Sequence, residues 1–193
     1  MANYNIISDI SEAIIKILKE GTVPDLIPNG ESIGMCHPSD RGDIVLGVNL
    51  YDIKRNMDIV PTDKISIGTG KQRNPSTYID LYYMITAYSS SDIKFRSFEE
   101  AKLIGRVIQL MAGRTVLKGD ILSAAASMRF PPRIEFQDYE NDEKMRLWNV
   151  PEVPYKLSLF YKVYPVEIES LTVSDVTRVV EADFTATEIK RED

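Results

Sequence analysis

Residues that could carry out catalysis or bind a metal are scarce in this 193-residue chain. Its only histidine, His37, directly follows its only cysteine, Cys36. Neighbouring side chains of an extended segment point to opposite faces, so this pair is poorly placed to act as a nucleophile and its base. A structural zinc site normally has four nitrogen or sulfur ligands, which these two residues cannot supply. The sequence therefore predicts no catalytic set and no metal site, and a chain that is not an enzyme.

A phosphate-binding loop is the cofactor motif that the chain matches in part. Residues 68–71 read Gly-Thr-Gly-Lys, but the motif also needs a glycine at position 65 and a serine or threonine at position 72. These positions hold Ile65 and Gln72, so we interpret the segment as a flexible loop and predict no cofactor. Closely spaced carboxylates occur as Glu99 with Glu100, Asp138 with Glu140, and Asp142 with Glu143. Acidic residues are favoured at the start of a helix, so these pairs need no catalytic role.

Basic residues gather in one stretch of the chain, at Lys94, Arg96, Lys102, Arg106 and Arg114. A solvent-exposed helix face explains them, and so does a contact surface for an acidic protein neighbour. We keep both interpretations. The candidate partner-interface residues from this stretch are Lys94, Arg96, Lys102 and Arg106.

The overall charge limits the classes of partner. The formal net charge is −6, which argues against a protein that binds nucleic acid by neutralising phosphates and against a polybasic membrane-surface binder. An apolar fraction of 44% and a charged fraction of 27% are ordinary for a globular protein, and no apolar run approaches the ~18 residues of a membrane span. We expect a protein made in the cytoplasm, with no membrane and no nucleic acid among its partners.

The first half of the chain predicts one helix and two long strands. Apolar residues recur at helical spacing from Ile7 to Leu18, with Ser8 or Asp9 as the cap and Gly21 just past the end. Residues 21–43 are rich in turn formers and predict a loop with one short strand near 32–36. Alternating apolar residues predict a strand at 44–54, and a run that is aromatic and β-branched throughout predicts a second at 78–88. A polar, exposed and mobile excursion at 54–75 separates them.

The second half begins with a longer helix. Ser97 and Glu100 have the spacing of a capping box, which predicts a helix from there to about Ala112. Its apolar set, which includes Phe98 and Ile108, is wider than one stripe and predicts packing on more than one side.

Three shorter elements and one long strand follow it. The pattern predicts a strand at 134–136, a helix at 141–148 capped by Asn141 or Asp142, and a long strand at 155–168. Trp148 should fill the junction between the short helix and the sheet. Residues 177–189 alternate in the manner of a strand with one apolar face. Its apolar side adds four candidate interface residues, Val180, Ala182, Phe184 and Ala186.

The order of these elements lacks the strand–helix–strand alternation of a parallel sheet. It predicts an α+β fold with a mostly antiparallel sheet and two main helices packed on one face. We divide the chain into a domain at 1–170 and a strand-like C-terminal extension at 171–193.

Four sequence blocks carry a resemblance to a known family. The first is the helix SDISEAIIKIL and the second is the strand VLGVNLYDIKRN. The third joins PSTYIDLYYMITAYSS to the helix AKLIGRVIQLMAGRTVLKG, and the last is LWNVPEVPYKLSLFYKVYPVEI. Together they resemble the cap or tail-terminator subunits of phage-tail-like contractile injection systems, chiefly the extracellular kind. In that family, a Pro-x-x-x-x-(D/N)-L-x-Y block, here Pro75 to Tyr83 with Asp80 at the D/N position, precedes the helix.

The resemblance implies a structural function and a tail-terminator-like fold. Similar proteins form a six-subunit ring on the distal end of the tube and sheath and stop their polymerisation. The partners implied are copies of the chain itself, in a hexameric ring, together with sheath and inner-tube subunits. The protein would belong to an assembled particle that is extracellular after release.

Two alternatives stay open at this stage. One is an assembly adaptor or chaperone of phage-tail morphogenesis that is absent from finished particles. The other is an enzyme that binds a small molecule at an uncommon site, which perturbed acids in a deep pocket would support.

Overall fold

The computed structural model describes residues 4–175, apart from the side chain of Ser127. The chain divides into two compact units. The larger unit contains the chain up to Pro61 together with Ser76–Glu169, and the smaller contains Thr62–Pro75 with the described residues from Ser170 on. The strand predicted at 177–189, with its four candidate interface residues, lies outside the described residues.

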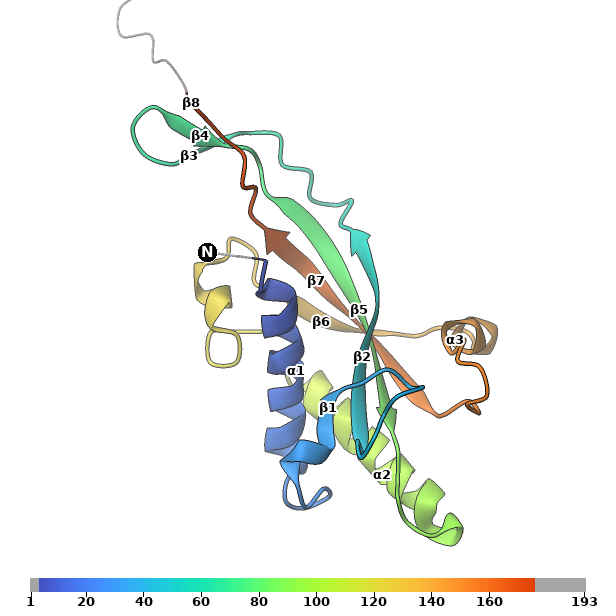
Figure 1. Cartoon of the computed structure of the whole chain (residues 1–193). Helices are drawn as coiled ribbons and strands as arrows, with labels where there is room; N and C mark the ends of the chain where they lie inside the picture. The colour runs from blue at the N-terminus through green and yellow to red at the C-terminus, as the bar shows by residue number, and fades with distance from the viewer. Residues whose placement is uncertain (1–3, 176–193) are drawn as a thin grey trace, which may run out of the picture. The chain divides into compact units, whose positions relative to one another are not determined.

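A five-stranded sheet forms the centre of the larger unit (Figure 1). Its strands, in spatial order, are β1 (Ile33–Met35), β2 (Leu46–Arg55), β5 (Thr77–Ala87), β7 (Ser158–Ile168) and β6 (Arg133–Gln137). Only the pair formed by β1 and β2 is parallel, and the other three neighbouring pairs are antiparallel. The predicted α+β fold with a mostly antiparallel sheet is confirmed.

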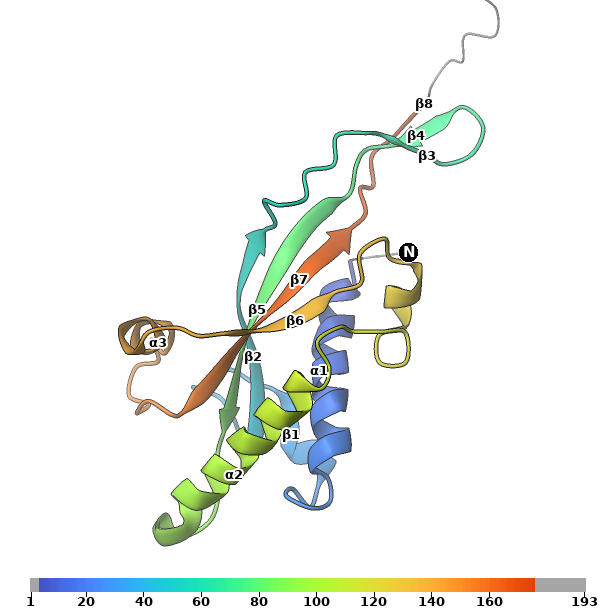
Figure 2. The ribbon, with the colours of Figure 1, turned by 180° about the vertical axis from the view of Figure 1, so that it is seen from behind.

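Helices cover this sheet on both faces, but unequally. The two long helices, α1 (Ile6–Thr22) and α2 (Ile93–Ala112), lie on one face, as predicted (Figures 1 and 2). The short helix α3 (Asn141–Leu147) lies on the other face. Two short 3-10 turns, at Gly30–Ser32 and Ser123–Ser127, complete the helical elements of the described residues.

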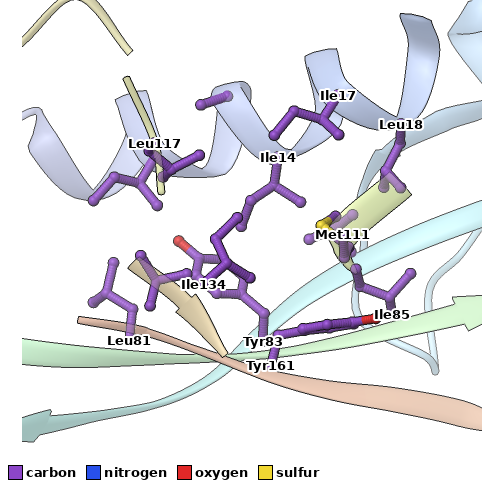
Figure 3. Packing of buried hydrophobic residues seen from close by; sticks show 14 of the residues in the cluster. Ile14, Ile17, Leu18, Leu81, Tyr83, Ile85, Met111, Leu117, Ile134 and Tyr161 are labelled. Carbon is purple, nitrogen blue, oxygen red and sulfur yellow. The ribbon is translucent and has the colours of Figure 1, made fainter. Parts of the chain in front are cut away.

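The main core lies between the sheet and the two long helices (Figure 3). Alternate residues of β5 face the helices, so Leu81, Tyr83 and Ile85 are buried against Ile14 and Met111. Burying a side chain of this size contributes about 1.5–3 kcal/mol, so this layer dominates the stability of the unit.

Tyr83 also provides a polar link through this core, between α1 and the sheet. Its hydroxyl lies 2.9 Å from that of Ser11 on α1, and both residues are buried. Burial raises the pKa of Tyr83 to about 12. The bond therefore joins α1 to β5 without placing a charge in the core.

A second, smaller cluster lies on the opposite face of the sheet, beside α3. It contains Met84, Tyr88, Trp148 and Phe160. The indole N–H of Trp148 donates to the carbonyl of Val153 at 3.1 Å. Trp148 is only 5% exposed, which confirms that it fills the junction between the short helix and the sheet.

Helix α1 differs from its prediction at both ends. It begins at Ile6 after Asn5, with no side-chain cap, so Ser8 and Asp9 lie inside its first turn. At the other end, Gly21 is inside the helix, because α2 passes so close that an added Cβ would lie 2.3 Å from a methyl carbon of Leu110. The glycine reflects a helix–helix contact and not a helix end.

The predicted caps of α2 and α3 are also wrong. Helix α2 begins at Ile93, so Ser97 lies within it and caps nothing. Helix α3 begins where predicted, but its cap is Glu140, which forms a reciprocal capping box with Glu143. Both helices are confirmed as elements, but their caps differ from the prediction and α2 begins four residues earlier than predicted.

The smaller unit is a three-stranded antiparallel sheet in the order β3 (Ile65–Ser66), β4 (Lys71–Arg73) and β8 (Val173–Asp175). Its hairpin turn places Gly68 and Gly70 at φ of 95° and 77°, a region that favours glycine because it has no Cβ. Part of the excursion predicted as an exposed loop is therefore a hairpin, and its glycines form a turn.

Candidate functional site

Helix α2 carries all four basic residues predicted as a partner surface, and two of them form hydrogen bonds within the chain. Arg106 donates from Nε to the carbonyl of Gly21 at 2.7 Å and from Nη1 to Gln109 at 2.7 Å. Arg96 donates to the carbonyl of Ser91 at 3.3 Å from Nη2. These two arginines hold α1 and the chain before α2 in place.

The two lysines of the set are placed differently. Lys94 and Lys102 both have exposed side chains on α2. They remain available to a partner as proposed interface residues. The other four proposed residues, at 180, 182, 184 and 186, lie beyond the part of the chain that the structure describes.

The apolar residues of α2 divide into a buried and an exposed set. The buried set, which faces the core, is Leu103, Ile104, Val107 and Met111. The exposed set is Ile93, Phe95, Phe98 and Ile108. Phe98 is 73% exposed and Ile93 is 83% exposed. The prediction of packing on more than one side is therefore wrong within the described chain, because only one side is covered.

These exposed apolar residues are the sequence feature that indicated a functional site on α2. An apolar arc wider than one stripe indicates more apolar surface than one contact within the chain can cover. Large exposed apolar patches on a folded unit are typical of partner surfaces. We therefore take the uncovered face of α2 as the candidate functional site.

The uncovered face has a regular composition along the helix. Phe98, Ala101, Gly105, Ile108 and Ala112 follow one another at spacings of three and four, so they lie along one side of α2. All five are exposed. A Cβ built on Gly105 would meet no atom within 4 Å, so nothing in the described chain explains a glycine in the middle of this helix.

Two open grooves border this face. One, of about 660 Å³, is lined by Asp25, Leu26, Lys102, Gly105, Arg106, Ile108 and Gln109. The other, of about 550 Å³, extends from Leu26 to Ser89–Ser91 and Glu99. They share Leu26 and Lys102, so α2 and the chain after α1 together form a hollowed surface that could receive side chains of a partner.

The first turns of α2 are fixed by polar contacts. Hydroxyls of Ser89 and Ser91 donate to the carboxylate of Glu99, the first at 2.6 Å. These two hydrogen bonds, together with the charge of Lys102, hold the pKa of Glu99 below its usual value. Lys156, two residues before β7, pairs with Glu100 at 2.8 Å. The exposed aromatic residues of α2 are thus presented on a positioned helix.

The remaining candidates from the sequence lie in ordinary structural settings. Cys36 is half-buried against Gly47 and Tyr88, and burial raises the pKa of its thiol. His37 is exposed and its Nδ1 lies 2.5 Å from the hydroxyl of Ser39. Among residues 4–175, no group of three or more histidine, cysteine or acidic side chains is placed to hold a metal ion.

No helix within residues 4–175 combines the length of a membrane span with enough apolar character to cross a bilayer.

Comparisons with known proteins point to one family. Residues 9–182 match the profile of the Pvc16 N-terminal domain. A comparison with curated protein sequences gives no match. Several chains of solved structures also match, among them a terminator and a cap.

The first of these structures is the sheath/tube terminator of PVC, an extracellular contractile injection system, in the extended state. It is 15% identical, with a TM-score of 0.66 over 95% of this chain and 64% of that chain. The second is the tube-terminating cap of the anti-feeding prophage, 19% identical, with a TM-score of 0.57 over 93% of this chain and 61% of that chain. The chain thus spans less than two thirds of the length of both these structures. Because the family profile covers most of its length, the chain belongs to the Pvc16 N-terminal domain family.

Proposed function

We propose that the chain is a cap that ends the tube and sheath of a contractile injection system and stops their polymerisation. The observation that carries this proposal is the shared fold with a sheath/tube terminator over 95% of the chain. A second structure with this fold is a tube-terminating cap, and the family profile covers residues 9–182.

The surface of α2 supports a role in assembly. A cap needs one surface that fits the last ring of the tube or sheath and contacts that join its own copies. Exposed Ile93, Phe95 and Phe98 on a well-anchored helix are typical of such a contact. A purely structural role needs no catalytic residues.

The finer parts of the proposal concern partners and location. Copies of the chain form a closed ring, a hexamer, whose neighbours are sheath and inner-tube subunits. Lys94, Arg96, Lys102 and Arg106, with Val180, Ala182, Phe184 and Ala186, contribute to these contacts. The protein is made in the cytoplasm and leaves the cell within the particle.

The experiment removes the gene for the chain from a system that also encodes tube and sheath, and measures particle lengths by electron microscopy. Loss of the cap should broaden the length distribution or leave particles without a sheath, and expression of the chain in trans should restore uniform lengths. Unchanged particles without the chain would contradict the proposal.

A second measurement separates a cap from an assembly adaptor. Mass spectrometry of purified particles from the restored strain should find the chain in a few copies per particle. Its absence from finished particles of normal length would favour the adaptor.

A further inference from the structure

A partner that covers the exposed face of α2 must match the chemistry of that face. The helix has 20 residues, a length of about 30 Å, and can supply a large part of the roughly 800 Å² that each partner buries in a stable interface. Its apolar centre is Phe98, Gly105 and Ile108. Residues 91–114 contain five basic and three acidic residues, a formal charge of +2.

A second surface of the larger unit has the complementary character. Residues 135–146, which include the end of β6 and helix α3, contain five acidic and two basic residues, a formal charge of −3. All five acids are exposed, namely Glu135, Asp138, Glu140, Asp142 and Glu143. Exposed Phe136 and Met145 give this surface an apolar part as well.

These two surfaces cannot meet within one chain. Helix α2 packs in the core on one face of the sheet, whereas α3 packs in the small cluster on the opposite face. Two different surfaces that fit each other on separate faces of a protomer produce a head-to-tail contact, which generates rings or filaments. A contact between identical patches would instead stop at a dimer.

We propose that the outer face of α2 of one copy binds residues 135–146 of the next copy, and that this contact closes the ring. Lys94 and Lys102 approach the acidic residues around Asp138 and Asp142, and an apolar side chain such as Met145 enters the groove above Gly105. This inference rests on the proposed function, because it specifies the contact between copies of the cap.

The test reverses the charges on each surface of the full chain and measures its oligomers by native mass spectrometry and sedimentation. Lys94→Glu with Lys102→Glu should weaken association by about tenfold or more, and so should Asp138→Lys with Asp142→Lys. All four changes in one chain restore complementarity and should return association to near the level of the unchanged chain. Arg55→Glu with Lys118→Glu, two exposed positions outside residues 91–114 and 135–146, changes the net charge by the same amount as the lysine pair and should leave association intact.

A second variant tests the apolar part without a charge change. Gly105→Gln adds volume in space that is empty in the single chain, so the melting temperature should not fall, yet association should weaken by about tenfold or more. Normal association by this variant and by both charge-reversal pairs would overturn the inference.

Two further outcomes of these experiments would also overturn the proposed contact. An unchanged chain that stays monomeric at high micromolar concentration would overturn the contact, while particle lengths would still test the cap separately. Variants that form rings but no longer cap particles would show that α2 binds a sheath or tube subunit, and this too would overturn the contact between copies.

Discussion

The side-chain amide of Asn56 donates to Asp80 Oδ1 at 2.7 Å, and both residues are buried. The other oxygen of Asp80 lies 2.9 Å from the ammonium of Lys162. Asn56 Oδ1 in turn accepts from the backbone N–H groups of Asp58 and Ile59 at 3.0 and 2.9 Å. One carboxylate on β5 therefore fixes the turn that follows β2 and a lysine on β7.

Removing this carboxylate should be costly. Asp80→Ala leaves a partly buried ammonium and a buried amide without their acceptor, so the free energy of unfolding should fall by about 3 kcal/mol. Chemical denaturation of the full chain measures it. Lys162→Met should cost less, and the double variant should cost less than the two single changes together. Strict additivity would mean that the two side chains do not interact.

Trp148 is the second site of a large predicted loss. Trp148→Ala removes a buried indole, its hydrogen bond to Val153 and its edge-to-face contact with Tyr155, whose ring centroid lies 5.6 Å away. The free energy of unfolding should fall by about 3–5 kcal/mol in a denaturant titration. A loss below about 1 kcal/mol would indicate that this cluster contributes little to the fold.

Two glycines inside helices should respond in opposite directions. Gly21→Val places carbon atoms where the side chain of Leu110 now lies, and should destabilise the chain by about 1–3 kcal/mol. Gly105→Ala meets no atom and should stabilise it by about 0.5–1 kcal/mol through helix propensity. Thermal and denaturant unfolding at one protein concentration compare them. Equal effects would contradict the close approach of α1 and α2 at Gly21.

Glu99 should make stability depend on pH in the acid range. Its pKa is lowered in the folded chain by hydrogen bonds from Ser89 and Ser91, so it binds protons more readily when unfolded. Its contribution is therefore present above the unfolded value of about 4.3 and disappears as pH falls through the folded pKa. Glu99→Gln should lower the melting temperature at pH 7, and the difference from the unchanged chain should shrink as the pH falls through the folded pKa of Glu99. Glu12→Gln, on the exposed side of α1, is the matched control, and an identical profile for both would refute the assignment.

The C-terminal residues give the fifth prediction. Deleting residues 176–193 removes the proposed interface positions 180–186 but leaves every described element present. The melting temperature should stay near that of the full chain, while ring formation or capping should be lost. If the shortened chain fails to fold, these residues belong to its own core and their proposed contact with a neighbouring subunit is wrong.

The sequence was sufficient to predict the long elements because their periods are strong. The aromatic and β-branched run at 78–88 reflects a strand buried on both faces, and the helical spacing in 7–18 reflects one buried face. Both elements were found within a few residues of their bounds. The starts of α1 and α2 were missed, since Asn5 and Asp92 make no side-chain cap and therefore leave no recognisable signature. The parallel pairing of β1 with β2 also has no local signal.

The candidate site was predictable only in part. The pattern drew attention to the basic residues of α2, but it could not separate Lys94 and Lys102 from two arginines that bond within the chain. The acceptor of Arg106 is the carbonyl of Gly21, 85 residues away in the sequence. The exposure of Phe98 likewise depends on which side of α2 the sheet covers, which only the tertiary structure determines.

The contact between Asp80 and Lys162 has a consequence for how related sequences can change. The family block that this chain resembles accepts aspartate or asparagine at the position of Asp80. Either residue offers an oxygen to Asn56, but only aspartate balances the charge of a lysine at position 162. Positions 80 and 162 should therefore covary, with lysine opposite aspartate and a neutral side chain opposite asparagine.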